Sequence, residues 1–207
     1  MTTFASRSFT DLLDLLAAPT PTPGGGVAAA LSGALGAAVG QMVASLPRTR
    51  HGTPEEHQRL MTAAATLGGL RATLLALADA DAQAVKQLVT ASRLPKTTPD
   101  ERQAWQAALA AAAREATRVP LETVSTAADA LEALVAVAAG GAPVAAADVF
   151  AAITLLSGAA DSAAATVRTN LTASRDDGYV RETSAALTLT LDRVERAVHD
   201  ALGALQA

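Results

Sequence analysis

One carboxylate, Asp81, interrupts an otherwise apolar helical stripe. Residues three and four positions apart share one face of a helix. The stripe that includes this carboxylate consists of Leu70, Leu74, Leu77, Asp81, Ala84 and Leu88. Burying an unpaired carboxylate is costly, and proteins respond with a raised pKa, a paired cation or a bound ligand. We therefore take Asp81 as the candidate catalytic residue, with a buried structural carboxylate as the alternative.

A glycine run precedes the most apolar segment of the chain. Residues 20–26 read TPTPGGG, and the next charged residue comes only after residue 46. Gly24, Gly25 and Gly26 allow the backbone to approach a ligand, and the amides at a helix start favour anionic or electron-rich groups. The run lacks the lysine of a P-loop and follows no predicted strand, so nucleotide binding is not supported. A tight turn between helices is the alternative interpretation.

Four further polar residues are candidates for binding. Arg93 and Lys96 follow the Asp81 helix, where they would either bind an anionic tail or be solvated. Asp148 and Asn170 lie at the two ends of one apolar stripe. Asp148 is equally explained as an acid that stabilises a helix start.

These residues require long helices to position them. Ser8 can cap a short first helix, which the prolines at 19, 21 and 23 would stop. Thr53-Pro54 and Thr98-Pro99 each begin a capping box with acids in the first turn. The expected longer helices cover residues 26–46, 54–91, 99–140 (kinked or divided at Pro120), 145–173 and 177–205. The prediction is a single all-α domain over residues 1–207, a bundle of long antiparallel helices.

Composition agrees with this fold class. Of the 207 residues, 50% are hydrophobic but only 2% are aromatic, which is typical of closely packed alanine-rich helices. The net charge of −4 and the absence of a basic stripe argue against a nucleic-acid partner. The chain has no cysteine, and its histidines at 51, 57 and 199 form no HxxxH pair, so no metal site is expected.

The uncharged segment 24–46 has about the length of a membrane span. Its residues are mainly alanine and glycine, and no aromatic anchors flank it. A helix buried in the bundle is the preferred interpretation. Asp11 and Asp14 within the first apolar stripe argue against a signal peptide, so we expect a cytoplasmic protein without membrane contact.

Several segments together resemble one known family over almost the full chain. They are SFTDLLDLLAAPTPTPGGG at the start, LADADAQAV around Asp81, RLPKTTPDER from Arg93, VPLETV from Val119, AADVF with Asp148, and TVRTNL with Asn170. In order and spacing they resemble the cyclodeaminase/cyclohydrolase family, which includes formiminotetrahydrofolate cyclodeaminase and the bacterial methenyltetrahydrofolate cyclohydrolases.

The resemblance implies an all-helical homodimer that acts on a tetrahydrofolate derivative and holds no permanent cofactor. Asp81 would be the acid/base, and the glycines at 24–26 would contact substrate with Asn170. Arg93 and Lys96 would bind the glutamate carboxylates of the folate, and Asp148 would belong to the substrate site. A separate formiminotransferase would be the partner in a reaction sequence.

Three functions follow from this resemblance. Cyclodeamination of 5-formiminotetrahydrofolate to 5,10-methenyltetrahydrofolate with release of ammonia is preferred; cyclohydrolysis of 5,10-methenyltetrahydrofolate and a non-catalytic folate-binding or scaffold dimer are the alternatives. The chain has Val27, Gly141 and Thr166 where serine, asparagine and asparagine are usual in the family. We expect these departures either to change which substrate is used or to abolish turnover.

Overall fold

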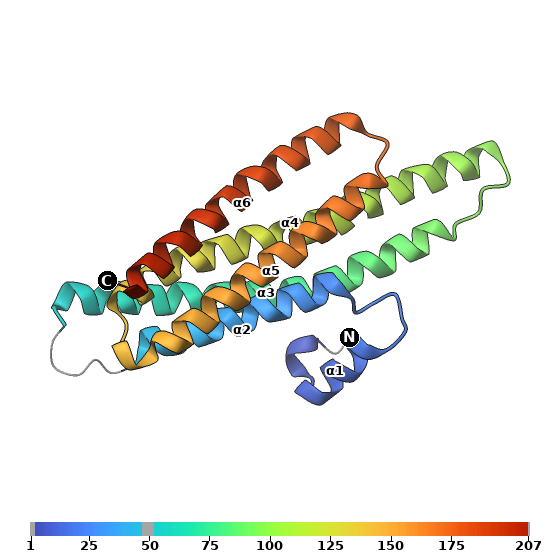
Figure 1. The fold of residues 1–207 in the computed structure, drawn as a ribbon. Helices are drawn as coiled ribbons and strands as arrows, with labels where there is room; N and C mark the ends of the chain where they lie inside the picture. The colour runs from blue at the N-terminus through green and yellow to red at the C-terminus, as the bar shows by residue number, and fades with distance from the viewer. Residues whose placement is uncertain (1–2, 47–51, 207) are drawn as a thin grey trace.

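The computed structural model describes residues 3–46 and 52–206, and these form helices without a strand among them. Two 3-10 turns, η1 (Phe4–Ser6) and η2 (Pro143–Ala145), accompany the α-helices. The helices are α1 (Phe9–Ala17), α2 (Gly25–Ser45), α3 (Pro54–Ser92), α4 (Pro99–Gly140), α5 (Ala146–Thr172) and α6 (Asp177–Gln206) (Figure 1). The all-α prediction is confirmed.

The predicted helix starts are also confirmed. The Ser8 side chain accepts a hydrogen bond from the backbone N–H of Asp11. Thr53 and Thr98 each cap their helix and form the reciprocal bonds of a capping box with Glu56 and Glu101. Such caps satisfy amide groups that have no partner within the helix, so they fix where α3 and α4 begin.

The predicted division of the fourth helix does not occur. Helix α4 continues through Pro120 to Gly140, and Pro120 itself is buried in the bundle. Proline removes one intrahelical hydrogen bond. The carbonyl that loses its donor, that of Ala116, accepts a hydrogen bond from the Asn170 side chain instead.

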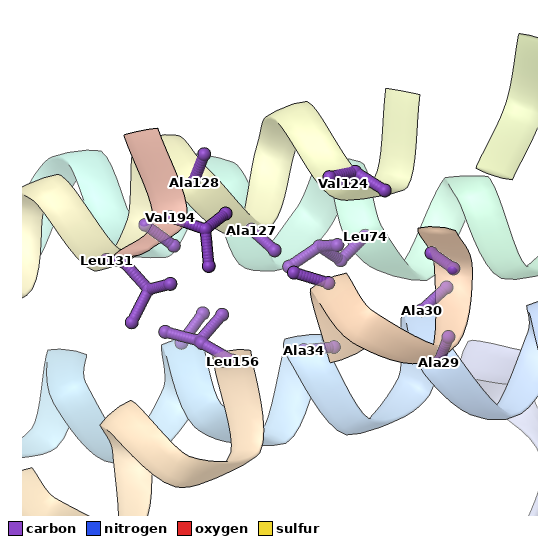
Figure 2. Packing of buried hydrophobic residues seen from close by; sticks show 14 of the residues in the cluster. Ala29, Ala30, Ala34, Leu74, Val124, Ala127, Ala128, Leu131, Leu156 and Val194 are labelled. Atoms are coloured by element: carbon purple, nitrogen blue, oxygen red, sulfur yellow. The ribbon is translucent and has the colours of Figure 1, made fainter. Parts of the chain in front are cut away.

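Glycines spaced seven residues apart bring α2 against α3. A Cβ at Gly40 would lie 3.3 Å from a Leu67 methyl carbon, and one at Gly33 would lie 3.3 Å from the Leu74 methyl carbons. Side chains from α3, joined at Gly40 by Leu134 of α4, therefore fill the space that α2 leaves open. Figure 2 shows this core from close by, with Leu74 among the alanines of α2 and α4.

The hairpin of α3 and α4 projects beyond the other helices. Helix α2 begins and α5 ends well before the turn between α3 and α4 is reached (Figure 1). The tip of this hairpin therefore extends beyond the ends of α2 and α5. The level at which α2 begins is the level at which the candidate site lies.

By length and composition, four helical segments of the described residues could cross a membrane: α2, α3, α4 and Pro143–Thr172. In the bundle α2 packs against both α3 and α5, and its alanines and glycines contribute to the core. The preferred interpretation of the uncharged segment, a helix buried among other helices, agrees with this packing.

Candidate functional site

The carboxylate of Asp81 lies against the start of α2. A Cβ at Gly26 would lie 2.6 Å from the Asp81 carboxyl carbon, closer than real Cβ contacts permit. The backbone N–H of Val27 donates a hydrogen bond to the same carboxylate. The pair Gly26 and Asp81 thus continues the series of glycine–leucine pairs, Gly40 with Leu67 and Gly33 with Leu74, along which α2 packs against α3. In this third pair a carboxylate takes the place of the leucine.

This position determines the electrostatics of Asp81. Its side chain is buried, with 6% of the residue exposed, and burial raises the pKa of its carboxyl group above the ordinary value. The N–H of Val27 partly opposes that rise because it stabilises the charged form. A carboxyl group with a raised pKa can donate a proton as well as accept one, as an acid/base requires.

Stability should depend on pH through Asp81. Its folded pKa lies above the unfolded value of about 3.9, so its contribution to stability is present below that pH and is lost as pH rises through the folded pKa. We expect the unfolding free energy of the wild type to fall, relative to Asp81→Asn, as the pH rises above about 4 and passes through the raised pKa of Asp81. Urea denaturation at a series of pH values measures this difference, and parallel curves for the two proteins would contradict it.

The glycine run differs from its predicted role in one respect. Gly24 precedes α2 in an extended conformation, and its carbonyl accepts the N–H of Ala28. No glycine of the described residues has a positive φ, so the run is not required for a left-handed turn. The anionic group at the helix start is the carboxylate of Asp81, and the absent Cβ of Gly26 makes room for it.

The register between α2 and α5 places the last turns of α5 at the same level along the bundle as the start of α2. A Cβ at Gly33 would lie 3.3 Å from Ala159, and one at Gly36 would lie 2.9 Å from Leu156. Continuing this antiparallel register brings Thr166 level with Gly26 and puts Asn170 about one helical turn, or ~6 Å, further along the axis. The TVRTNL segment therefore ends beside the Asp81 level.

Asn170 holds α5 to α4 at Pro120. Its amide nitrogen donates to the carbonyl oxygen of Ala116 at 2.7 Å. In a regular helix that carbonyl accepts from the N–H four residues later, which is position 120, and proline has no N–H. Asn170 thus supplies the donor that Pro120 lacks, in addition to any contact with substrate.

A double-mutant cycle should expose this coupling. Asn170→Ala is expected to lower the unfolding free energy by about 1–3 kcal/mol, because it leaves the Ala116 carbonyl without a donor. In a Pro120→Ala background the new N–H can bond that carbonyl, so the same change should cost less. Denaturant unfolding of the four proteins provides the measurement. Strictly additive effects would show that the two residues are not coupled.

A groove opens beside Asn170. It has a volume of about 590 Å³ and lies between α4 and the turn that joins α5 to α6. Thr117 and Asn170 line it at one end of its α4 wall, and Trp105 lines the other end. Arg114 and Tyr179 also line it, and the guanidinium carbon of Arg114 lies 4.8 Å from the centre of the Tyr179 ring.

The other predicted binding residues lie further away. Arg93 and Lys96 are at the tip of the α3–α4 hairpin, with Arg93 about 18 Å along α3 from Asp81. The Lys96 ammonium lies 4.8 Å from the centre of the Trp105 ring, so it stands at the outer end of the groove.

Asp148 is not brought to this site. It is exposed in the first turn of α5, at the opposite end of the helix from Asn170. By the same register it lies about 27 Å along the bundle from the Asp81 level. Its place agrees with the alternative interpretation, an acid that stabilises a helix start.

Within residues 3–46 and 52–206, no three His, Cys, Asp or Glu side chains gather as ligands for a metal ion. His57 and His199 belong to these ranges, and His51 lies outside the described residues.

Sequence reasoning identified Asn170 but missed Trp105, Arg114 and Tyr179, which also line the groove. These three residues are themselves exposed or half-buried in α4 and α6. The single tryptophan of the chain was the only signal available for this region.

The formiminotransferase-cyclodeaminase family model matches residues 8–188 of the chain. A methenyltetrahydrofolate cyclohydrolase of Methylorubrum extorquens is 41% identical over 109 residues, which are 53% of this chain and 52% of that protein. A formimidoyltransferase-cyclodeaminase of Mus musculus is 36% identical over 109 residues, which are 53% of this chain and 20% of that protein. The matched region thus spans about half the length of the first relative and a fifth of the second.

The fold also matches a solved structure. The crystal structure of formiminotetrahydrofolate cyclodeaminase from Thermotoga maritima superimposes with a TM-score of 0.86 and covers 98% of this chain and 97% of that one. The two sequences are 23% identical, so this likeness concerns the fold.

Proposed function

Because this chain belongs to the formiminotransferase-cyclodeaminase family, we propose that it is a tetrahydrofolate cyclodeaminase with Asp81 as its acid/base. In this reaction nitrogen 10 of 5-formiminotetrahydrofolate attacks the formimino carbon held on nitrogen 5. The tetrahedral intermediate then expels ammonia, which leaves the cyclic 5,10-methenyl cation. A proton must leave the attacking nitrogen, and another must reach the departing one.

The observation that supports this role is the buried carboxylate of Asp81 at the start of α2. Its raised pKa suits proton transfer in both directions. Its ionised form would also stabilise positive charge that develops on the amidinium-like carbon. The Val27 N–H orients the carboxylate, because a hydrogen bond to one carboxylate oxygen limits rotation of the side chain.

The second candidate is methenyltetrahydrofolate cyclohydrolase, which the relative at 41% identity favours. There, water attacks the methenyl carbon and the ring opens to the 10-formyl product. The same carboxylate would take a proton from the attacking water and return it to the leaving nitrogen. The two reactions share the methenyl compound and differ in the nucleophile.

One pair of assays distinguishes the candidates. Purified protein is mixed with 5-formiminotetrahydrofolate and, separately, with 5,10-methenyltetrahydrofolate, and the absorbance of the methenyl chromophore is followed. An increase in the methenyl absorbance with release of ammonia supports cyclodeaminase activity. A faster decrease in that absorbance supports cyclohydrolase activity. No effect of the protein on the absorbance in either assay would contradict the catalytic proposal. The non-catalytic scaffold function would then remain.

We further propose that the enzyme acts as a cytoplasmic homodimer and receives its substrate from a separate formiminotransferase. Met42 of α2 and Phe150 of α5 support the dimer, because both are exposed and the helix register puts them at one level. Light scattering measures the oligomeric state. A monomer at micromolar concentration would contradict this part of the proposal.

A further inference from the structure

Helices α3 and α5 meet α2 at the same glycine in the middle of the bundle. A Cβ at Gly33 would lie 3.3 Å from the Leu74 methyl carbons of α3 and 3.3 Å from the Cβ of Ala159 in α5. The two side chains therefore approach one point of α2 from two helices and form one layer of the core. Both helices pack against α2 and run antiparallel to it (Figure 1), so such layers repeat along the bundle.

The corresponding layer at the start of α2 contains two polar side chains. A step of seven residues is about two helical turns, so it returns a side chain to nearly the same face. On α2 and α3 this step leads to Gly26 and Asp81, whose contact the structure shows directly. On α5 the same step leads from Ala159 to Thr166. The layer thus brings the carboxylate of Asp81 and the hydroxyl of Thr166 to the start of α2 from two different helices.

The hydroxyl group of Thr166 is available as an acceptor. It donates its proton to the backbone carbonyl oxygen of Ser162 at 3.1 Å, so its hydrogen is engaged within α5. The hydroxyl oxygen keeps lone pairs that can accept a further hydrogen bond. Thr166 is half-buried, and a hydrogen bond that is partly shielded from water is electrostatically stronger. Thr166 therefore suits a ligand group that carries an N–H or an O–H.

Neighbouring polar side chains are engaged elsewhere. The amide nitrogen of Asn170, one turn further along α5, donates to the carbonyl oxygen of Ala116. The carboxylate of Asp79 accepts a backbone N–H of the N-terminal segment. These contacts leave the Thr166 hydroxyl as the candidate acceptor beside Asp81.

We propose that Thr166 accepts a hydrogen bond from the atom that is exchanged at the reacting carbon of the folate, while Asp81 exchanges a proton with that same atom. The inference rests on the proposed function, because it assumes a folate whose reacting carbon lies beside Asp81. The exchanged atom is the departing nitrogen in cyclodeamination and the water oxygen in cyclohydrolysis.

The proton balance of cyclodeamination shows what Thr166 contributes. Nitrogen 10 attacks the carbon of the protonated formimino group and gives its proton to the Asp81 carboxylate. Asp81 then returns this proton to the amino nitrogen. The carbon–nitrogen bond breaks, ammonia leaves with the electron pair, and the methenyl product keeps the positive charge. An N–H of the amino group that is donated to Thr166 turns the nitrogen lone pair towards the proton on Asp81.

Water in the second candidate reaction meets the same two groups. It would donate one O–H to Thr166 and lose its other proton to Asp81 as its oxygen attacks the methenyl carbon. In both reactions the contact orients the exchanged atom and does not hold the folate itself. Its loss should therefore affect kcat more than KM.

Two substitutions at Thr166 test this contact. Thr166→Val removes the hydroxyl and keeps the branched shape, whereas Thr166→Ser keeps the hydroxyl. With the folate that the wild type turns over, we expect Thr166→Val to lower kcat on the order of tenfold with KM nearly unchanged. Thr166→Ser should retain most of the activity. Thr154→Val is the matched control, because this exposed threonine of α5 makes the same kind of bond, to the carbonyl oxygen of Phe150 at 2.9 Å.

Urea denaturation separates a lost contact from a lost fold, and Thr166→Val should be about as stable as Thr154→Val. The inference is overturned if Thr166→Val keeps the wild-type kcat, if Thr166→Ser is as impaired as Thr166→Val, or if Thr154→Val is impaired equally. A loss of activity that follows a loss of stability would assign the hydroxyl to the fold and overturn it too. These outcomes leave the proposed function standing, whereas a wild type that turns over neither folate would contradict both.

Discussion

Asp81→Asn is expected to lower kcat by about 10²–10⁴-fold, the usual contribution of a positioned acid/base. Asparagine has nearly the same shape and can still accept the N–H of Val27 through its amide oxygen, so the helix packing around it should persist. What it cannot do is exchange a proton with the reacting nitrogens. The measurement is steady-state turnover with both folates, together with circular dichroism at matched concentration.

Asp79→Asn is the matched control for this substitution. Asp79 lies on the same helix but points elsewhere, where its carboxylate accepts the backbone N–H of Phe4 at 2.9 Å. It changes the charge by the same amount within one helical turn, so a general charge effect would appear in both variants. Full activity in Asp81→Asn, or an equal loss in Asp79→Asn, would remove Asp81 from the catalytic role.

The helices could be predicted from the sequence because the patterns that define them are local. Caps at Ser8, Thr53 and Thr98 and the apolar stripes depend on residues within one or two turns. The position of Asp81 among leucines of one stripe is equally local, and the structure buries it as that stripe predicts. The contact between Asp81 and Gly26 joins residues far apart in sequence, so periodicity alone could not reveal it.

Pro120 shows why other features of the fold could not be predicted from the sequence alone. By local rules it should kink or divide α4, and the division does not occur, because the helix continues to Gly140. The donor that replaces its missing N–H is Asn170, which lies on another helix. Tertiary packing overrides the local preference, and it also gives Asn170 a structural role that its motif alone did not suggest.

Gly26→Ala should reduce turnover on the order of 10²-fold while changing stability little. The added Cβ would meet the Asp81 carboxyl group, which is a side chain and can move, and a displacement near 1 Å can cost that much in rate. Alanine gains about 1 kcal/mol of helix propensity over glycine, which offsets part of the cost of about 1–3 kcal/mol for overpacking. Activity and stability should therefore separate in this variant.

The pH profile distinguishes this displacement from a general structural defect. If the carboxylate moves away from the Val27 N–H, it loses the contact that lowers its pKa, so the pH dependence of turnover governed by Asp81 should shift to higher pH. Gly25→Ala places a Cβ where nothing lies within 4 Å, so it should leave this pH dependence in place. Gly69→Ala, on the exposed face of α3, controls for the change in helix propensity. A Gly26→Ala variant with unchanged rate and pH profile would show that the glycine serves helix packing alone.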